Sequence, residues 1–461
     1  MQGAKLAVRN PATLEIVGEV GDASIEDLDA AVAACRRAWP GWRDLSLDRR
    51  RAVVAALGAR LAAHADELAA MLTAEQGKPL ADAKGEILGA AGWLQAVSEQ
   101  ELPVRIVEDS DIRRTELRHV PLGVVGAIAP WNFPIILALW KVAPALVTGN
   151  CVLLKPSPFT PLTTCRIAQI ASEIVPSGVF SVITGGDQLG PWLTAHSGID
   201  KISFTGSTQT GRKVMASAST TLKRVTLELG GNDPAIIFPD VDIEAVVPDL
   251  FWAAFRNSGQ ICIASKRIYV HADIYERFRD AFVAYAQTVR MGDGAREGIG
   301  LGPVQNAPQF DRVKALVADC RANGFTIFTG RAPEAEVGYF MPVTIIDNPP
   351  DDSRIVREEP FGPVVPLLRF ETIDEVIARA NASDFGLAGS VWSRDPDLAR
   401  SVASALECGT VWVNEVQHIT PETPFGGHKQ SGLGVEGGAE GLREYTNAQV
   451  ISVRKPAPQS E

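Results

Sequence analysis

The chain has 461 residues, enough for two or three domains with extensive cores, and its 46% hydrophobic and 21% charged content is ordinary for a globular enzyme. The formal net charge of -11 argues against nonspecific binding to nucleic acid or to an anionic membrane surface. No apolar run approaches the ~20 residues that span a bilayer, and the first residues show no secretory pattern.

The first hundred residues contain apolar side chains at helical spacing, and Gly77-Lys78-Pro79 ends the longest such pattern. The spacing predicts amphipathic helices over residues 24–38, 48–76 and 80–100. Residues 106–119 then alternate between apolar and polar, which predicts an extended hairpin that leaves the globule.

From residue 121 onward, short apolar runs alternate with helical patterns. The predicted strands cover residues 124–128, 151–156, 179–184, 201–204 and 223–229. Helices are expected from residue 135 and over 162–174. Such alternation predicts a doubly wound α/β domain, in which helices cover both faces of a parallel sheet.

A second α/β region follows, with predicted strands over residues 266–270 and 364–370. Its predicted helices cover residues 243–257, 275–289, 309–323 and 372–380. The tail over residues 449–454 is strand-like. An exposed edge strand of this kind invites pairing with another subunit.

Six cysteines are scattered without CxxC spacing, which disfavours a disulfide framework or a metal site and fits a reducing cytoplasm. Most of them are expected to be packing residues. Without its neighbours in the sequence, Cys262 would also be interpreted as a small buried packing residue. However, Cys262 follows Ser258-Gly259-Gln260, a small polar stretch that permits close approach of the backbone. A nucleophilic cysteine needs such access and a local field that favours the thiolate.

Two polar residues lie at the ends of predicted strands. Glu228 precedes Gly230-Gly231, and it is either an exposed strand-end carboxylate, an ion-pair partner or a general base. Partial burial would raise its pKa toward neutrality. Asn132 is either a helix cap or an amide that holds a carbonyl oxygen as negative charge develops, and both roles are compatible.

With Pro130-Trp131-Asn132-Phe133-Pro134 and Glu359-Pro360-Phe361-Gly362-Pro363, these segments resemble the NAD(P)-dependent aldehyde dehydrogenase superfamily over nearly the whole chain. The resemblance implies oxidation of a small-molecule aldehyde to the acid by NAD(P) and water. It assigns Cys262 as the nucleophile that forms a thiohemiacetal and then a thioester. Glu228 is the implied general base, and Asn132 with the Cys262 amide is the implied oxyanion hole.

The resemblance also implies a cofactor site. Gly206 to Gly211 departs from the GxGxxG fingerprint and alone marks only a turn, but free N–H groups at a helix N-terminus there can bind pyrophosphate. The implied cofactor residues are Trp131, Lys155, Ser157, Gly206, Ser207, Gly230, Glu359 and Phe361. NAD-preferring members carry a glutamate three residues beyond the lysine, where this chain has Pro158. We therefore expect NAD to be used, with NADP also usable.

Less specific positions complete the site. Lys141 and Glu436 match positions of a proton relay, although such residues are mostly solvated. The implied substrate mouth consists of Glu415, Gln417, His418, Ile419 and Phe425. This stretch contains no arginine, which disfavours a small carboxylated semialdehyde, although Arg256 could enter from elsewhere.

We expect residues 1–102 and 122–230 to form the dinucleotide-binding domain and residues 231–430 the catalytic domain. Residues 103–121 and 446–456 are expected to pair across subunits as a small β oligomerisation element, giving a homodimer or homotetramer. Three alternatives remain: a CoA-acylating dehydrogenase, against which Glu228 argues, a cysteine hydrolase without hydride chemistry, and a non-catalytic protein on the same scaffold.

Overall fold

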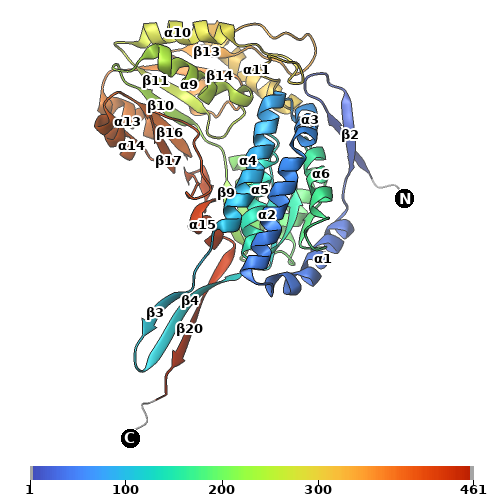
Figure 1. Ribbon diagram of the computed structural model, residues 1–461. Coiled ribbons are helices and arrows are strands. Elements are labelled where there is room, and N and C mark those ends of the chain that lie inside the picture. The colour runs from blue at the N-terminus through green and yellow to red at the C-terminus, as the bar shows by residue number, and fades with distance from the viewer. Residues whose placement is uncertain (1–3, 457–461) are drawn as a thin grey trace.

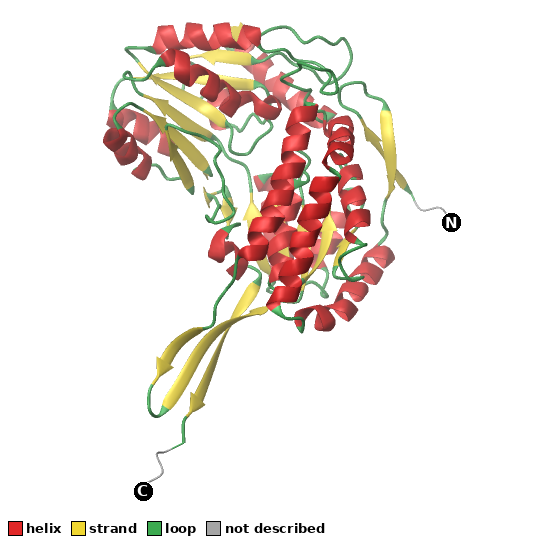
Figure 2. Cartoon of the chain, viewed as in Figure 1, coloured by secondary structure: helices red, strands yellow, loops and turns green. Residues whose placement is uncertain are grey.

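Two open β-sheets organise the chain, and a thin antiparallel arm projects away from them (Figures 1 and 2). The structure, a computed structural model, describes residues 4–456, so residues 1–3 of the expected cofactor domain lie outside it. The predicted α/β class with parallel sheets is confirmed. Within residues 4–456, no helix is both long enough and apolar enough to cross a membrane.

The first sheet has the strand order β19-β9-β8-β5-β6-β7. Its strands are β5 (Val124–Ile128), β6 (Cys151–Lys155), β7 (Phe180–Val182), β8 (Lys201–Thr205), β9 (Arg224–Glu228) and β19 (Gly432–Leu433). Neighbours are parallel except for β19, which runs antiparallel to β9. The connections run in opposite directions on the two sides of β5. Ligands of open α/β sheets bind at such a switch point, beyond the carboxyl ends of the strands.

Helices enclose this sheet. They are α1 (Ile25–Arg43), α2 (Leu47–Ala63), α3 (Ala65–Gln76), α4 (Leu80–Glu99), α5 (Ile136–Val147), α6 (Leu162–Ala171), α7 (Leu189–Ala195) and α8 (Thr208–Ser219). Helices α1 and α5 pack on β5 and β6, α4 packs on α5, and α2 packs on α4 (Figure 1). Strand β6 is buried along its whole length, as expected for a strand that is covered on both faces.

The second sheet has the order β12-β13-β14-β11-β10-β16-β17, and only β12 is antiparallel within it. Its strands are β10 (Asp233–Ile237), β11 (Ser265–His271), β12 (Thr326–Thr329), β13 (Thr344–Asp347), β14 (Val364–Phe370), β16 (Ala388–Trp392) and β17 (Thr410–Val413). Its helices are α9 (Ile243–Phe255), α10 (Tyr275–Thr288), α11 (Ala307–Ala322), α12 (Arg354–Arg357), α13 (Ile373–Asn381) and α14 (Pro396–Ser404). Ala235 and Ile237 pack into one apolar cluster and Ile236 into another, so this sheet is also buried on both faces.

Several predicted boundaries are wrong. The single helix expected over residues 48–76 is two helices, because the backbone of His64 leaves the helical region (φ -102°, ψ 15°) between α2 and α3. Apolar periodicity continues through this break, so spacing did not indicate it. The helix expected over 243–257 ends at Phe255, because Asn257 and Ser258 have φ of 51° and 55°. The helix over 162–174 ends at Ala171.

The arm is a three-stranded antiparallel sheet in the order β20-β4-β3. It consists of β3 (Arg105–Asp109), β4 (Arg113–Pro121) and β20 (Thr446–Arg454), which confirms both the hairpin and the strand-like tail. The expectation that these segments pair across subunits is wrong for the ladder between β20 and β4. That ladder forms within one chain, with Val450 opposite Leu117.

Short elements complete the fold: β1 (Lys5–Arg9), β2 (Ile16–Gly21), β15 (Phe385–Gly386), β18 (His428–Lys429), α15 (Gly438–Arg443) and a 3-10 turn over Arg256–Gly259. The chain leaves β9 at Glu228 and enters β10 at Asp233, so four residues connect one sheet to the other. This short connection brings the two sheets together around the glycine pair 230–231.

Candidate active site

The sequence-predicted residues come together where the carboxyl ends of the first sheet meet the amino ends of the second. Asn132 follows β5, Lys155 ends β6, Gly206 follows β8 and Glu228 ends β9. From the other side, Cys262 precedes β11, and Glu359 precedes β14. Contacts join the two edges: the Gly231 N–H donates to Glu359 Oε1 at 3.1 Å, and Asn132 Nδ2 donates to the Gln260 carbonyl at 3.0 Å.

A tight turn presents Cys262. Asn257, Ser258 and Gly259 have φ of 51°, 55° and 72°, so the backbone reverses directly after α9. A Cβ at Gly259 would lie 2.2 Å from the Gly362 carbonyl oxygen, so this close approach requires glycine. Lys266 Nζ donates to the Cys262 carbonyl at 2.5 Å and fixes the far side of the turn.

The protein's own groups do not provide the thiolate-favouring field that the sequence analysis expected. Burial raises the pKa of Cys262 to about 12, and the nearby carboxylates Glu359, Asp233 and Glu228 act in the same direction, while Lys266 opposes them. At neutral pH, these groups therefore favour the neutral thiol over the thiolate. A further positive charge or a proton acceptor is therefore needed when the sulfur attacks.

Asn132 is buried, and its hydrogen bonds exclude the helix-cap role at this end of α5. The cap position of α5 is Ile135, which makes no side-chain cap bond. The Asn132 carbonyl accepts from Lys78 Nζ at 2.9 Å and from Asn257 Nδ2 at 3.1 Å, so its backbone is held on two sides. A primary amide has two N–H donors, and one of them bonds to Gln260. The other remains for a substrate oxygen.

Glu228 is 5% exposed, and its Oε1 has no hydrogen-bond partner among the described residues. Burial raises the pKa of its carboxyl well above the ordinary value, and the charge of Glu436 adds to the effect, while Lys141 opposes it. An unpaired buried carboxyl is costly. Buried carboxyls with raised pKa values cluster at functional sites, and a raised pKa suits a general base.

Lys141 and Glu436 form a buried ion pair next to this carboxyl. The distance from Lys141 Nζ to Glu436 Oε1 is 2.5 Å, and both side chains are 1% exposed. Ser203 Oγ also donates to Glu436 Oε1 at 3.3 Å and accepts from Tyr445 Oη at 3.1 Å. The pair therefore belongs to a hydrogen-bonded chain behind Glu228, rather than to the solvated surface.

The expected cofactor residues follow the same edge of the first sheet, and their chemistry fits a dinucleotide. Lys155 is 7% exposed, and its Nζ makes only a long 3.5 Å contact to the Pro156 carbonyl among the described residues. Ser207 caps α8 by accepting from the Thr210 N–H at 3.2 Å, and the first turn of α8 contains no acidic residue. The Lys155 ammonium is therefore available to bind ribose hydroxyls, and the N–H groups at the start of α8 are available to bind pyrophosphate.

The other expected cofactor residues gather around Glu359. A Cβ at Gly230 would lie 2.4 Å from Glu359 Oε2, so this glycine lets the carboxylate approach the backbone. Phe361 packs edge-on against Trp131 with ring centroids 5.4 Å apart. Glu359 Oε1 lies 2.9 Å from Lys266 Nζ.

The mouth residues divide into two groups. A cavity of about 690 Å³ contains Cys262, Asn132 and Glu228 among its lining residues, and Gln417, Ile419 and Phe425 also line it. Glu415 and His418 are exposed and lie outside this lining, so the cavity does not bring them together with the other three. The loop turns at Asn414 and Gln417, whose φ angles are positive, and His418 contributes its carbonyl to Trp412 Nε1 instead. Arg256, named as an alternative arginine, does line the cavity.

Two positioning lysines were missed. Lys78 and Glu86 form a fully buried pair, 2.5 Å apart, and Glu86 Oε1 accepts from the N–H groups of Ile135 and Ile136 at the start of α5. Lys266 holds Glu359, Gly231 and Cys262 together. The signal for Lys266 was present in the sequence, because a lysine inside a buried strand requires partners.

Comparisons with known proteins agree with this geometry. A family model described as the aldehyde dehydrogenase family matches residues 1–451. A putative aldehyde dehydrogenase of Gibberella fujikuroi is 43% identical over 419 residues, which cover 91% of this chain and 89% of the relative. A betaine aldehyde dehydrogenase of Staphylococcus aureus, solved with NAD+, superposes with a TM-score of 0.94 at 33% identity, covering 98% of this chain and 92% of that one. An NADP-dependent enzyme of E. coli gives a TM-score of 0.95 at 36% identity, covering 98% and 95%.

Proposed function

The chain belongs to the aldehyde dehydrogenase family, and we propose that Cys262, Glu228 and Asn132 carry out its chemistry. The protein is an NAD(P)-dependent aldehyde dehydrogenase that oxidises an aldehyde to the carboxylic acid. The observation that carries the residue roles is the unpaired, buried Glu228 carboxyl, which lines the same cavity as the Cys262 thiol and the Asn132 amide.

In the first half of the proposed reaction, the Cys262 sulfur adds to the aldehyde carbon and the carbonyl oxygen becomes negatively charged. The free Nδ2 hydrogen of Asn132 and the Cys262 backbone N–H, which has no acceptor among the described residues, stabilise that charge. What NAD(P)+ supplies when bound is a hydride acceptor and a positive charge that favours the thiolate. Loss of hydride from the substrate carbon leaves a thioester on Cys262.

In the second half, Glu228 removes a proton from water, the hydroxyl adds to the thioester carbon, and the carbon–sulfur bond breaks. The acid leaves, and Cys262 is restored. Lys141 and Glu436 are proposed to pass the proton from Glu228 onward, because their ion pair lies within charge–charge range of it. A water-activating carboxyl favours hydrolysis over transfer of the acyl group to CoA.

For the cofactor, we propose that Lys155 and Ser157 hold the adenosine ribose, that the N-terminus of α8 at Gly206 and Ser207 holds the pyrophosphate, and that Glu359 holds the nicotinamide ribose. Trp131, Gly230 and Phe361 shape the groove. Pro158 occupies the place of the carboxylate that repels a 2′-phosphate in NAD-preferring members. However, Asp22 and Asp187 lie near enough to Lys155 to influence its pKa, so a 2′-phosphate would meet negative charge from another side.

We therefore expect acid and reduced cofactor in a 1:1 ratio without added CoA, from both NAD and NADP. The two values of kcat/KM should differ by less than ~1000-fold, equivalent to about 4 kcal/mol. Pro158→Glu should lower kcat/KM with NADP by ~10-fold or more and leave NAD within about threefold, because it adds a like charge beside the 2′-phosphate. Phe159→Glu, at the exposed neighbouring position, controls for added charge. A requirement for CoA would contradict the hydrolytic role of Glu228.

We also propose that the arm makes the protein a homodimer or homotetramer. Strands β3 and β20 are the free edges of its sheet. Large apolar side chains on the arm are strongly exposed: Ile106 43%, Val107 56%, Ile112 67%, Val450 63% and Val453 55%. Contiguous exposed apolar groups on an unpaired edge mark an association surface.

Light scattering should accordingly give a mass of at least two chains at micromolar concentration. The double variant Val450→Asp/Val453→Asp should shift this mass toward one chain, because charge opposes burial of the edge. The control Gln449→Asp/Ser452→Asp adds the same charge at polar positions of β20 and should shift it less. A monomeric wild-type chain would remove the arm from this role.

Finally, we propose a cytoplasmic location, which the six free cysteines favour. The domain limits given above remain our proposal. Strand β19 rejoins the first sheet just after residue 430, in agreement with the proposed end of the catalytic domain.

A further inference from the structure

The cavity is much larger than the reacting atoms require. Its volume of about 690 Å³ falls in the range of sites for drug-sized molecules, whereas the thiol, amide and carboxyl occupy one part of it. The remaining walls come from α4, α5 and the segments around Ile263 and Ile419. The size and polarity of these walls determine which aldehydes can reach Cys262. An inference about the substrate therefore rests on the function proposed above.

Part of the α4 wall is bare, although Asp82, Glu86 and Trp93 of the same helix also line the cavity. Gly85, Gly89 and Gly92 of α4 all line the cavity and are spaced four and three residues apart, so they share one helix face. A Cβ added at Gly85 or Gly92 would meet no atom within 4 Å, and at Gly89 it would meet only Ile136 Cδ1 at 3.4 Å. From Gly85 to Gly92, this bare face extends for about 10 Å along the helix. Packing does not require glycine at these three positions, because a larger residue's Cβ would not collide with a neighbour. The glycines therefore leave open volume in the cavity.

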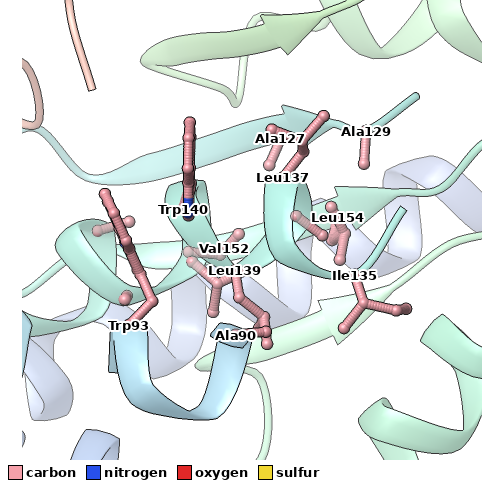
Figure 3. Packing of buried hydrophobic residues seen from close by; sticks show 14 of the residues in the cluster. Ala90, Trp93, Ala127, Ala129, Ile135, Leu137, Leu139, Trp140, Val152 and Leu154 are labelled. Carbon is pink, nitrogen blue, oxygen red and sulfur yellow. The ribbon is translucent and has the colours of Figure 1, made fainter. Parts of the chain in front are cut away.

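Next to these glycines the lining is aromatic, and Trp93 follows Gly92 directly on α4. Trp93 and Trp140 stack with ring centroids 4.6 Å apart, and Phe425 meets Trp140 edge-on at 5.8 Å. Figure 3 shows the two indoles side by side, Trp93 from α4 and Trp140 from α5, with Leu137 on the same helix as Trp140. Because each indole presents a face to the other, the pair forms an apolar wall rather than a box around a cation.

Charge within the lining is balanced. Lys78 and Glu86 neutralise each other in their 2.5 Å pair. Asp82 and Arg256 lie within charge–charge range of each other, so neither presents an isolated charge to a substrate. Each of these charges thus has an opposite charge nearby, which weakens the field that a carboxylated or a quaternary ammonium aldehyde would meet, although Arg256 makes no ion pair within 4 Å among the described residues.

We propose that the physiological substrate class is a large, uncharged, apolar aldehyde, with a ring system or a long hydrocarbon chain, that packs against the bare glycine positions of α4 and the neighbouring aromatic side chains. Gly85, Gly89 and Gly92 are then specificity-determining positions. Each methylene that enters this cavity should increase kcat/KM by roughly threefold to fourfold until the cavity is full.

The test compares wild type with Gly92→Leu on propanal, decanal, 2-naphthaldehyde, succinic semialdehyde and betaine aldehyde. Leucine at position 92 has room at its Cβ, where no atom lies within 4 Å, should extend into the open volume and should stabilise the helix relative to glycine. We expect it to lower kcat/KM for decanal and naphthaldehyde at least 30-fold and to leave propanal within threefold. Gly41→Leu is the matched control, since position 41 is a helical glycine of α1, exposed, also with nothing within 4 Å, and outside the cavity.

A second measurement is independent of turnover. In the inactive variant Cys262→Ala, the dissociation constant of decanal can be measured by quenching of tryptophan fluorescence. This constant should increase at least 10-fold when Gly92→Leu is added. The proposal is overturned if wild type prefers propanal, succinic semialdehyde or betaine aldehyde, or if Gly92→Leu slows all aldehydes equally. Failure of wild type to oxidise any aldehyde would instead contradict the proposed function. Oxidation of propanal with no gain for decanal contradicts the substrate class alone.

Discussion

Replacing Cys262 by alanine is expected to lower kcat/KM for aldehyde oxidation by at least ~10⁴-fold, the loss typical for removal of a covalent nucleophile. The alanine removes the sulfur without adding bulk. Cys262 is only partly buried, and the turn that carries it is held by backbone and Lys266 contacts that do not use the thiol. The melting temperature and the affinity for NAD should therefore stay close to those of wild type. Steady-state NADH formation, calorimetry and cofactor titration measure the three quantities.

Cys165→Ala is the matched control, because Cys165 is also partly exposed and burial also raises the pKa of its thiol, to about 11, yet it lies on α6 outside the cavity. It should retain activity within about twofold. Mass spectrometry of the wild type, quenched during turnover, should find the acyl group on the peptide that contains Cys262. If Cys262→Ala retained activity within tenfold of wild type, another group would have to be the nucleophile.

The broad architecture was accessible from sequence because it rests on short-range patterns. Strands such as β6 are continuous apolar runs between turn residues, and this pattern predicts a buried parallel strand. The helix break at His64 was not accessible, since the backbone change there leaves the apolar spacing intact. Five strands of the second sheet were also missed, each only four or five residues long: β10, β12, β13, β16 and β17.

The site shows the same division. Cys262, Asn132 and Glu228 lie in distinctive segments, so the sequence predicted their proximity, and the structure places all three in the lining of one cavity. The pKa of the Cys262 thiol was not predictable, because it depends on burial by segments far away in the chain. The exposed positions of Glu415 and His418 were not predictable for a similar reason. Which side chains of a loop face inward depends on its backbone turns, and here Asn414 and Gln417 adopt positive φ.

The second large effect is expected for Glu228→Gln, which should lower the steady-state rate by ~10²- to 10³-fold, the usual range for loss of a general base. Glutamine has the shape of the protonated carboxyl, and burial already favours the neutral form by raising the pKa of Glu228. The variant should therefore fold normally. Hydride transfer precedes the water step, so stopped-flow should record a burst of up to one NADH per subunit, followed by slow turnover.

The pH dependence gives an independent readout with a defined sign. A carboxyl with a raised pKa is protonated, and inactive as a base, below that pKa, so the wild-type steady-state rate should fall as pH decreases through it. Glu228→Gln has no such group and should lose this limb of the profile. Glu244→Gln, an exposed carboxyl on α9, should keep both the rate and the limb. An unchanged rate near neutral pH would exclude Glu228 as the base, whereas loss of the burst together with turnover would show that it acts before hydride transfer.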